Sequence, residues 1–264
     1  EVFECYITYR TNDTNLIGLW DRVRDYDECS IEYIANNHFQ SEFNNTIFSK
    51  ECEDEIILCL NYDGLYGINS INRYLQAANE NPSIRWYQYI FKVGDPILFY
   101  DTKRFYGVFY NNLKGKIIGI NKEEDKITFD VRIFKRYSYL QINPFVEMLD
   151  SSSEEWTDFR FTVYGYNSED YDKDTDENHF IPFQIAYAVS IHKAQGLEYD
   201  SVKILLTNEI EEKITHNIFY TAITRAKKYL KIYWLPETSS TIMKNICEKP
   251  TEKDIHIFKN KFNL

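Results

Sequence analysis

Apolar runs and polar segments alternate between residues 184 and 232 in an order that predicts strand, loop, strand, helix and strand. The run 184–189 contains β-branched and aromatic residues, which favours a buried strand. The run 202–206 is continuously apolar, as strands of parallel sheets usually are. The segment 190–196 between them is largely polar and ends at Gly196, which predicts a helical turn closed by glycine.

A helical period follows the second apolar run. Apolar residues at the spacing of one helix face are Phe219, Ala222, Ala226 and Leu230. We therefore expect one amphipathic helix through these positions, with Arg225 on another side of it.

The first ninety residues repeat the pattern of a strand followed by a helix. Residues 2–9 alternate as a strand would, and a turn at 12–14 precedes a helix. The apolar positions of that helix are Leu16, Leu19, Trp20 and Val23. The run 56–60 predicts a second strand, and turn residues at 61–67 precede another helical pattern. Its apolar positions are Ile68, Ile71, Leu75 and Ala78.

From residue 91 onward the period changes to short strands bounded by turns, which predicts a small β-barrel. The expected strands are 96–100, 115–121, 126–132 and 159–163. Basic and aromatic residues are interleaved in this region, and such residues can meet phosphates and stack on bases.

Composition allows one large core or two small ones, since the 264 residues are 44% hydrophobic and 17% aromatic. The net charge of −11 argues against general attraction to nucleic acid. However, residues 151–180 alone hold nine acidic and two basic residues, so the remainder is only mildly acidic. We interpret 167–179 as a solvated acidic linker rather than a metal site.

Five cysteines show no CxxC pair and no histidine at zinc spacing, so we predict reduced cysteines and no metal site. The sequence has no apolar run of membrane-spanning length and no signal peptide at its start. These features predict a cytoplasmic protein without membrane partners.

Two motifs in the 184–232 segment resemble those of superfamily 1 helicases. SIHKAQGLEYDSV, from Ser190, resembles motif V, and FYTAITRAKKYL, from Phe219, resembles motif VI. The resemblance implies that Arg225 is a catalytic residue that contacts the γ-phosphate of ATP, for which a planar, permanently charged guanidinium is suited. It also implies nucleotide contacts from Gln195, Gly196 and Glu198, and nucleic-acid contacts from Ser190, His192 and Lys193. The sequence departs from the family at Ala194, where serine is common, and at Ser190, where threonine is commoner.

Each residue also has an ordinary structural explanation when it is taken alone. Gly196 would then be a helix cap, His192 a surface histidine and Arg225 a solvated base on a helix. Both motifs occur in the family's order within the expected strands and helices, and this combination favours the helicase interpretation.

Two further segments extend the resemblance. Arg10 follows a tyrosine at the end of the first predicted strand, which resembles motif IV and implies a second catalytic arginine on the γ-phosphate. LNYDGLYGINSINRYLQAANENP is similar to the segment between motifs IV and V of RecD-like helicases, where the loop before the helix approaches DNA. Asn61 lies in this loop as a candidate DNA contact, and a surface turn held by Gly64 and Gly67 is the alternative.

KVGDPILFYDTKRFYGVFYNNLKGKIIGI resembles the small Src-homology-like barrel that RecD-type helicases insert in their second motor domain. Lys114 and Lys116 are the candidate nucleic-acid contacts there. The implied fold is α/β, a RecA-like second motor domain whose parallel sheet is flanked by helices, with an inserted β-barrel. The expected limits are 1–90 and 180–240 for the motor domain, 91–166 for the barrel, 167–179 for the linker and 241–264 for a C-terminal tail.

The phosphate-binding loop GxxxxGK[ST] and an acidic pair for Mg²⁺ are absent from the sequence. In the family these belong to the first motor domain, which would precede Glu1. We therefore expect ATP and Mg²⁺ as cofactors of the full-length enzyme, and neither cofactor binding nor ATP hydrolysis by this segment alone.

The resulting hypothesis is the C-terminal motor portion of an ATP-dependent DNA helicase that moves 5′ to 3′ along single-stranded DNA and unwinds duplexes. Its expected partners are single-stranded DNA, the N-terminal motor domain, and nuclease or repair subunits. The alternative is a non-catalytic nucleic-acid or protein-binding module derived from a helicase. A nuclease has no support, because no carboxylate cluster of PD…ExK character is present.

Overall fold

The computed structural model describes residues 10–100, 102–137, 143–165, 179–209 and 214–247, together with Lys259 and Lys261. The chain divides into two compact units, one formed by residues 1–71 and 188–264 and the other by residues 72–187. The strand predicted for 2–9 and nearly all of the acidic linker 167–179 lie outside the described residues.

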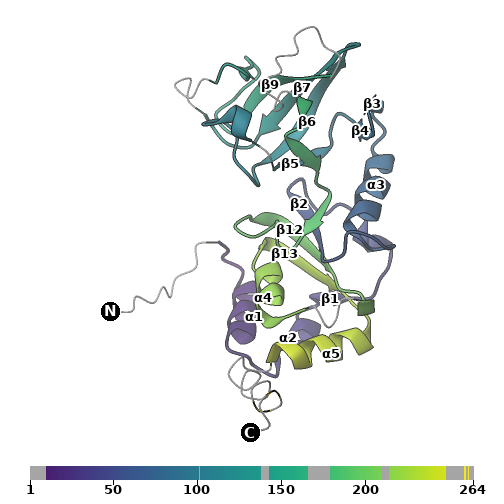
Figure 1. The fold of residues 1–264 in the computed structure, drawn as a ribbon. Helices are drawn as coiled ribbons and strands as arrows, with labels where there is room; N and C mark the ends of the chain where they lie inside the picture. The colour runs from purple at the N-terminus through teal and green to yellow at the C-terminus, as the bar shows by residue number, and fades with distance from the viewer. Residues whose placement is uncertain are drawn as a thin grey trace. The chain divides into compact units, whose positions relative to one another are not determined.

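The first unit is built on a five-stranded parallel sheet with the order β1-β13-β12-β2-β11 (Figure 1). Its strands are β1 (Gln40–Ser41), β2 (Glu55–Cys59), β11 (Ala188–Ser190), β12 (Tyr199–Leu205) and β13 (Ala226–Tyr233). The central strands β2 and β12 are buried almost throughout, which agrees with their continuous apolar sequences.

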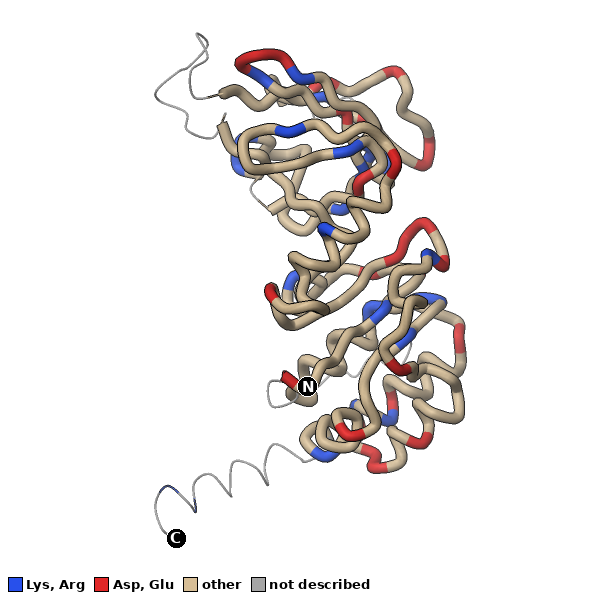
Figure 2. The backbone as a smooth tube through the Cα atoms, turned by 90° about the vertical axis from the view of Figure 1, so that its right-hand side faces the viewer, with Lys and Arg blue, Asp and Glu red and all other residues tan. Residues whose placement is uncertain are grey.

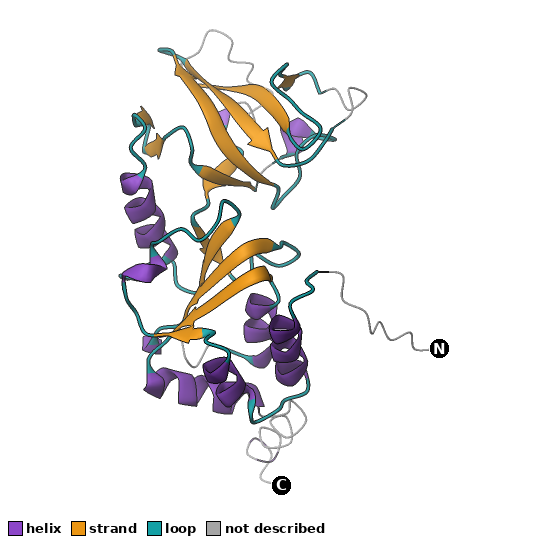
Figure 3. Cartoon of the chain, turned by 180° about the vertical axis from the view of Figure 1, so that it is seen from behind, coloured by secondary structure: helices purple, strands orange, loops and turns teal. Residues whose placement is uncertain are grey.

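Four helices gather beside this sheet (Figure 3). They are α1 (Thr14–Arg24), α2 (Ser30–Asn36), α4 (His216–Ile223) and α5 (Pro236–Cys247). α1 and α4 contact each other and β13, and α4 also contacts β12. A short 3₁₀ helix, η1 (Asn45–Ile47), precedes β2. Parallel strands covered by helices confirm the predicted α/β class.

Helix α1 forms as its sequence pattern predicts. The carboxylate of Asp13 accepts hydrogen bonds from the backbone N–H groups of Asn15 (2.8 Å) and Leu16 (3.1 Å), so it caps the helix. The buried face contains Leu16, Leu19, Trp20 and Val23, the four residues that the period selected. The Trp20 indole N–H donates to the carbonyl of Ile223 (3.1 Å), which ties α1 to the end of α4.

The helix predicted to continue through Ala226 and Leu230 is wrong. α4 ends at Ile223, and both of those residues belong to β13, which pairs in parallel with β12 on one side and β1 on the other. Positions four apart share a face in a helix and also in a strand, because four is a multiple of the strand period. The spacing of Ala226 and Leu230 therefore fits a helix and a strand equally well. Pairing with strands on both sides makes the segment a strand.

The strand predicted for 184–189 is also corrected, because the run divides between two sheets. β10 (Phe183–Ile185) pairs antiparallel with β5 (Pro96–Phe99) in the second unit, whereas β11 pairs in parallel with β2 in the first unit. An apolar run reports burial, and it carries no information on which sheet each residue joins.

The second unit contains a six-stranded antiparallel sheet with the order β10-β5-β6-β7-β9-β8. Its further strands are β5 (Pro96–Phe99), β6 (Lys114–Lys122), β7 (Lys126–Ile133), β8 (Glu147–Met148) and β9 (Thr157–Tyr164). The unit also holds the hairpin of β3 (Ile84–Trp86) and β4 (Tyr89–Phe91), and the 3₁₀ helix η2 (Lys103–Phe105). Helix α3 (Ile68–Ala78) contains the boundary between the units at residue 71. The four strands expected in this region are confirmed.

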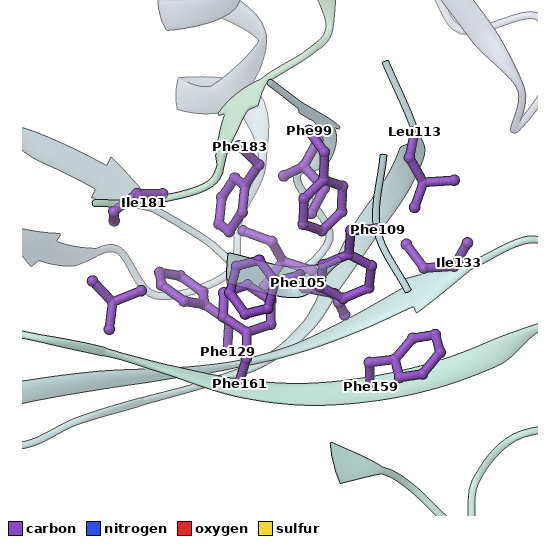
Figure 4. Close-up of a cluster of buried hydrophobic side chains, with 14 of the residues drawn as sticks. Phe99, Phe105, Phe109, Leu113, Phe129, Ile133, Phe159, Phe161, Ile181 and Phe183 are labelled. Atoms are coloured by element: carbon purple, nitrogen blue, oxygen red, sulfur yellow. The ribbon is translucent and has the colours of Figure 1, made fainter. Parts of the chain in front are cut away.

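Phenylalanine dominates the core of the second unit (Figure 4). β7 alternates buried and half-buried residues along its whole length, so one face of the sheet lies on this core. Phe129 and Phe183 meet edge to face with ring centroids 5.0 Å apart, and Phe105 and Phe161 are 5.1 Å apart. Such contacts among large rings form a compact core from few residues.

Basic and acidic positions are interspersed along the backbone of both units (Figure 2). On the second unit, Arg132 forms two hydrogen bonds with the buried carboxylate of Asp158 (both 2.8 Å), and Arg160 pairs in the same way with Asp130 (2.7 and 2.8 Å). These arginines are thus neutralised by neighbouring strands. Within the part of the chain that the structure describes, no helix is long and apolar enough to cross a membrane.

We expect Asp13→Ala to destabilise the first unit by about 1 kcal/mol, because two N–H groups at the start of α1 lose their acceptor. Urea unfolding followed by circular dichroism would measure this. Asp25→Ala is the matched control, because Asp25 lies at the opposite end of α1, where an acidic residue does not favour the helix dipole. Equal losses for both variants would contradict the capping role.

Asp200 should give the first unit a pH-dependent stability. The hydrogen bond from Lys228 (2.8 Å) is the main cause that lowers the pKa of Asp200 below its ordinary value of 3.8, and Lys227 (2.9 Å) adds to it. A lowered folded-state pKa stabilises the fold above the unfolded-state pKa, and this stabilisation disappears as the pH falls through the lowered value. Asp200→Asn should therefore cost at most about 1 kcal/mol near neutral pH and less in acid. Urea unfolding of both proteins at neutral pH and in acid would measure the loss of unfolding free energy caused by Asp200→Asn. An equal loss under the two conditions would contradict the assignment.

Candidate functional site

Two residues of the helicase-like motifs meet at the amino ends of neighbouring strands. Glu198 immediately precedes β12, and Arg225 immediately precedes β13. The two strands are parallel and begin in register, with Tyr199 opposite Ala226. Because both strands start at the same end of the sheet, Arg225 bonds to the carbonyl of Leu197, which lies 28 positions earlier in the sequence.

Arg10 joins this cluster from the segment before α1. Its Nε donates to Oε1 of Glu198 (2.7 Å), and its Nη1 donates to the carbonyl oxygen of Thr224 (2.7 Å). The guanidinium carbon lies 5.9 Å from the ring centroid of Trp20, the α1 residue bonded to Ile223. Arg10 is therefore fixed on three sides by groups of the first unit.

The side chain of Arg225 is buried, with 8% of its surface exposed. Its Nε donates to the carbonyl of Thr221 (2.8 Å), its Nη1 to the carbonyl of Leu197 (3.0 Å), and its Nη2 to the hydroxyl of Thr224 (3.0 Å). A guanidinium has five N–H donors, so two are left over after these bonds with the described residues. Arg225 thus contacts the end of the motif V loop and keeps donor capacity.

The two guanidinium groups share Thr224 and influence each other. Burial is the main cause that lowers the pKa of Arg225, the positive charge of Arg10 lowers it further, and Glu198 acts in the opposite direction. Arginine remains ionised in proteins despite such shifts. The cluster therefore contains two cations and one carboxylate, and an added anion would relieve the repulsion between the cations.

The loop from Ser190 to Glu198 runs from the carboxyl ends of the parallel strands back to their amino ends. Ser190 lies opposite Cys59 at the carboxyl end of β2, whereas Ser201 lies opposite Glu55 at its amino end. The loop thus returns along about four residues of strand, roughly 13 Å. One of its ends lies at the arginine cluster, and the other lies at the opposite edge of the same sheet.

Hydrogen bonds inside this loop make it a compact turn. The hydroxyl of Ser190 accepts from the backbone N–H of Lys193 (3.2 Å), and its carbonyl accepts from Ala194 (3.1 Å). Gly196 has a φ of +83°, which side chains other than glycine rarely adopt, and a Cβ added there would meet open space. His192, Gln195 and Gly196 are exposed, so they can reach an external ligand, whereas Ser190 is buried.

Asn61 lies on the same edge as Ser190, two residues after β2 ends. Its carbonyl accepts from the N–H of Ile68 (2.9 Å) and so fixes the start of α3. A cavity of about 280 Å³ opens here, and residues that follow β2, β12 and β13 line it, among them Asn61, Asn208 and Leu235. The carboxyl edge of a parallel sheet is a common place for ligand binding.

Lys114 and Lys116 belong to the second unit, where they project from one face of β6 with the buried Gly115 between them. Lys116 lies opposite Arg132 of β7. The structure therefore brings Arg10, Glu198 and Arg225 together, and it places the two lysines in a separate unit.

Sequence reasoning did not identify Thr224, Trp20 or the Leu197 carbonyl as parts of the cluster. Thr224 could have been recognised, since it lies next to Arg225 and has a hydroxyl that can accept a hydrogen bond. The other two depend on packing between segments that are distant in sequence. In the described ranges, no group of three or more His, Cys, Asp or Glu side chains could hold a metal ion.

Comparison with known proteins identifies the segment that holds Glu198 and Arg225. Residues 185–233 match the family model of the UvrD-like helicase C-terminal domain. The RecBCD enzyme subunit RecD of Buchnera aphidicola subsp. Schizaphis graminum is 25% identical over 202 residues, which cover 74% of this chain and 27% of RecD. RecD of Mycolicibacterium smegmatis is 44% identical over 46 residues, covering 17% of this chain and 8% of RecD. The chain thus spans about a quarter of the length of this Buchnera relative.

Among solved structures, Bacteroides Pif1 bound to single-stranded DNA has a similar fold, with a TM-score of 0.52 at 14% identity. The match covers 97% of this chain and 56% of that Pif1 chain. Residues 185–233 are therefore similar to a UvrD-like helicase C-terminal domain, and the chain is similar to RecD over about three quarters of its length.

Proposed function

We propose that the chain is the C-terminal motor portion of an ATP-dependent DNA helicase that couples ATP hydrolysis to 5′ to 3′ movement on single-stranded DNA and to duplex unwinding. The observation that carries this proposal is the cluster of Arg10, Glu198 and Arg225 at one end of the motif V loop. A module that only binds nucleic acid would have no need for two guanidinium groups held beside each other at that place.

The cluster fits the phosphate end of a nucleotide. Arg225 has two N–H donors that the described residues leave over, and Arg10 adds a second positive charge beside it. Both would hold the γ-phosphate, with Glu198, Gln195 and Gly196 on the sugar side. ATP and Mg²⁺ would supply the phosphoryl-transfer chemistry, and this chain's arginines would stabilise the charge that develops on the phosphate oxygens.

The loop would transmit the state of the nucleotide site to the nucleic acid. Its nucleotide end is bonded to Arg225 through the Leu197 carbonyl, and its other end starts beside the carboxyl end of β2. Exposed His192 and half-buried Lys193 would contact the strand there, as would Asn61 on the neighbouring loop. A shift of the arginine cluster would therefore move the residues that hold the strand.

The partners in this proposal are single-stranded DNA and an N-terminal motor domain that carries the phosphate-binding loop. Similarity to a subunit of the RecBCD enzyme supports nuclease or repair subunits as further partners. We place the helicase in the cytoplasm.

Replacing Arg225 should strongly reduce DNA-stimulated ATP hydrolysis by the complete helicase. We expect Arg225→Ala to lower DNA-stimulated ATP turnover by roughly 10³-fold or more, as loss of an arginine that stabilises phosphoryl transfer does. Arg225→Lys should recover little, because an ammonium group cannot reproduce the planar fork. A coupled-enzyme ATPase assay measures both variants.

Arg24→Ala is the matched control, since Arg24 is exposed on the last turn of α1. Urea unfolding of each variant separates misfolding from loss of chemistry. Undiminished turnover in a folded Arg225→Ala protein would refute the assigned role.

Lys114 and Lys116 provide a second test, on the nucleic-acid side. If both contact phosphates, Lys114→Gln with Lys116→Gln should weaken oligothymidylate binding and reduce the slope of log affinity against log salt by about 1.4. Fluorescence anisotropy at several salt concentrations gives the slope. Lys122→Gln at the exposed end of β6 is the control. An unchanged slope in the double variant would remove these lysines from the path of the strand.

A further inference from the structure

The second unit contains a cavity of about 740 Å³, which is within the usual size range of small-molecule sites. Its walls come from the end of β5, from η2 and the turn after it, and from the segment following β7. Four tyrosines and two lysines are among the lining residues: Tyr100, Lys103, Tyr106, Tyr110, Lys135 and Tyr137. None of the described lining residues is acidic.

Tyr137 is the buried polar group of this cavity. Only 8% of its surface is exposed, and its hydroxyl has no hydrogen-bond partner among the residues that the structure describes. Its backbone N–H donates to the hydroxyl of Thr157 (3.0 Å), and its ring meets Phe159 edge to face at 5.1 Å. The residue is thus firmly placed, while its polar atom is unsatisfied. Buried hydroxyl groups nearly always have a partner, so this one is available to a ligand or a water molecule in the cavity.

Tyr106 and Tyr110 provide exposed aromatic surface beside it. Their exposed fractions are 87% and 49%, so both rings are open to a ligand. The backbone at Tyr106 is held by the side-chain amide of Asn143, which donates to its carbonyl (3.2 Å). A flat ring on a fixed backbone is a suitable platform on which a nucleobase can stack.

Lys103 and Lys135 make the cavity cationic. The Nζ of Lys135 lies 5.5 Å from the ring centroid of Tyr110 and 5.2 Å from that of Tyr137. Neither lysine forms an ion pair within the described part of the chain, whereas Arg132 and Arg160 on the same sheet are both paired with aspartates. Two unneutralised cations on a protein of net charge −11 favour an anionic ligand.

We propose that this cavity binds a nucleoside phosphate, with the base stacked on Tyr106 or Tyr110, the phosphate at Lys103 and Lys135, and the Tyr137 hydroxyl donating to the ligand. Burial raises the pKa of Tyr137 to about 12, so the hydroxyl remains a donor at neutral pH. A peptide would satisfy the rings, but it would not require the two cations.

The bound nucleoside phosphate is either a free nucleotide or one nucleotide of a single strand. Binding of a single strand here rests on the proposed helicase function, whereas binding of a free nucleotide does not. Because the readout is direct binding by the 264-residue chain without ATP turnover, its failure is distinguishable from failure of the motor proposal.

The test uses isothermal titration calorimetry with adenosine monophosphate, adenosine and inorganic phosphate, and anisotropy with labelled oligothymidylate. We expect Tyr106→Ala to weaken base-containing ligands by roughly 5- to 150-fold. Tyr137→Phe, which removes one oxygen and leaves the ring, should weaken binding by about 2- to 10-fold. Lys103→Gln with Lys135→Gln should weaken adenosine monophosphate and leave adenosine unchanged.

Two controls lie outside the cavity. Lys122→Gln repeats the charge change on the same sheet, and Tyr229→Ala removes an exposed tyrosine of the first unit. Binding of adenosine monophosphate that depends on the cavity residues supports a free nucleotide, and binding of oligothymidylate alone supports a strand. The proposal is overturned if neither ligand depends on these residues or if the controls have the same effect.

Discussion

The parallel pairing of β12 with β13 is the constraint on which the candidate site depends. It aligns the starts of the two strands, so that Glu198 and Arg225 emerge at one edge of the sheet. Arg10 can then bond to Glu198 and to the Thr224 carbonyl at the same time. If the strands slipped by two residues, the carboxylate and the buried guanidinium would separate by about 7 Å. Apolar packing of the sheet thus determines the geometry of the charged groups.

Thr224 connects the two arginines because its carbonyl accepts from one and its hydroxyl accepts from the other. It also ends α4, where the helix gives way to β13. Arg225 is therefore attached to the transition between helix and strand, and Arg10 bonds to the same point. Side chains held in this way lose little entropy when an anion arrives, which favours binding.

Local patterns in the sequence predicted the elements well where one period stood out. The buried face of α1 and the apolar strand β12 followed from spacing and composition alone. The end of α4 and the division of 184–189 could not be predicted, because both depend on which distant strand offers a pairing partner. Arg10, Glu198 and Arg225 were found through motif resemblance, whereas their mutual contacts required the three-dimensional fold. The Tyr137 cavity had only a weak signal, the interleaving of basic and aromatic residues.

The lengths of the strands in the parallel sheet have a consequence for how the protein behaves in concentrated solution. The two outermost strands, β1 with two residues and β11 with three, are shorter than the central strands, which have five to eight. Exposed strand borders are the usual template for intermolecular β-pairing and aggregation. A strand only two or three residues long offers few backbone groups to a second molecule, so β1 and β11 are themselves poor templates for such pairing.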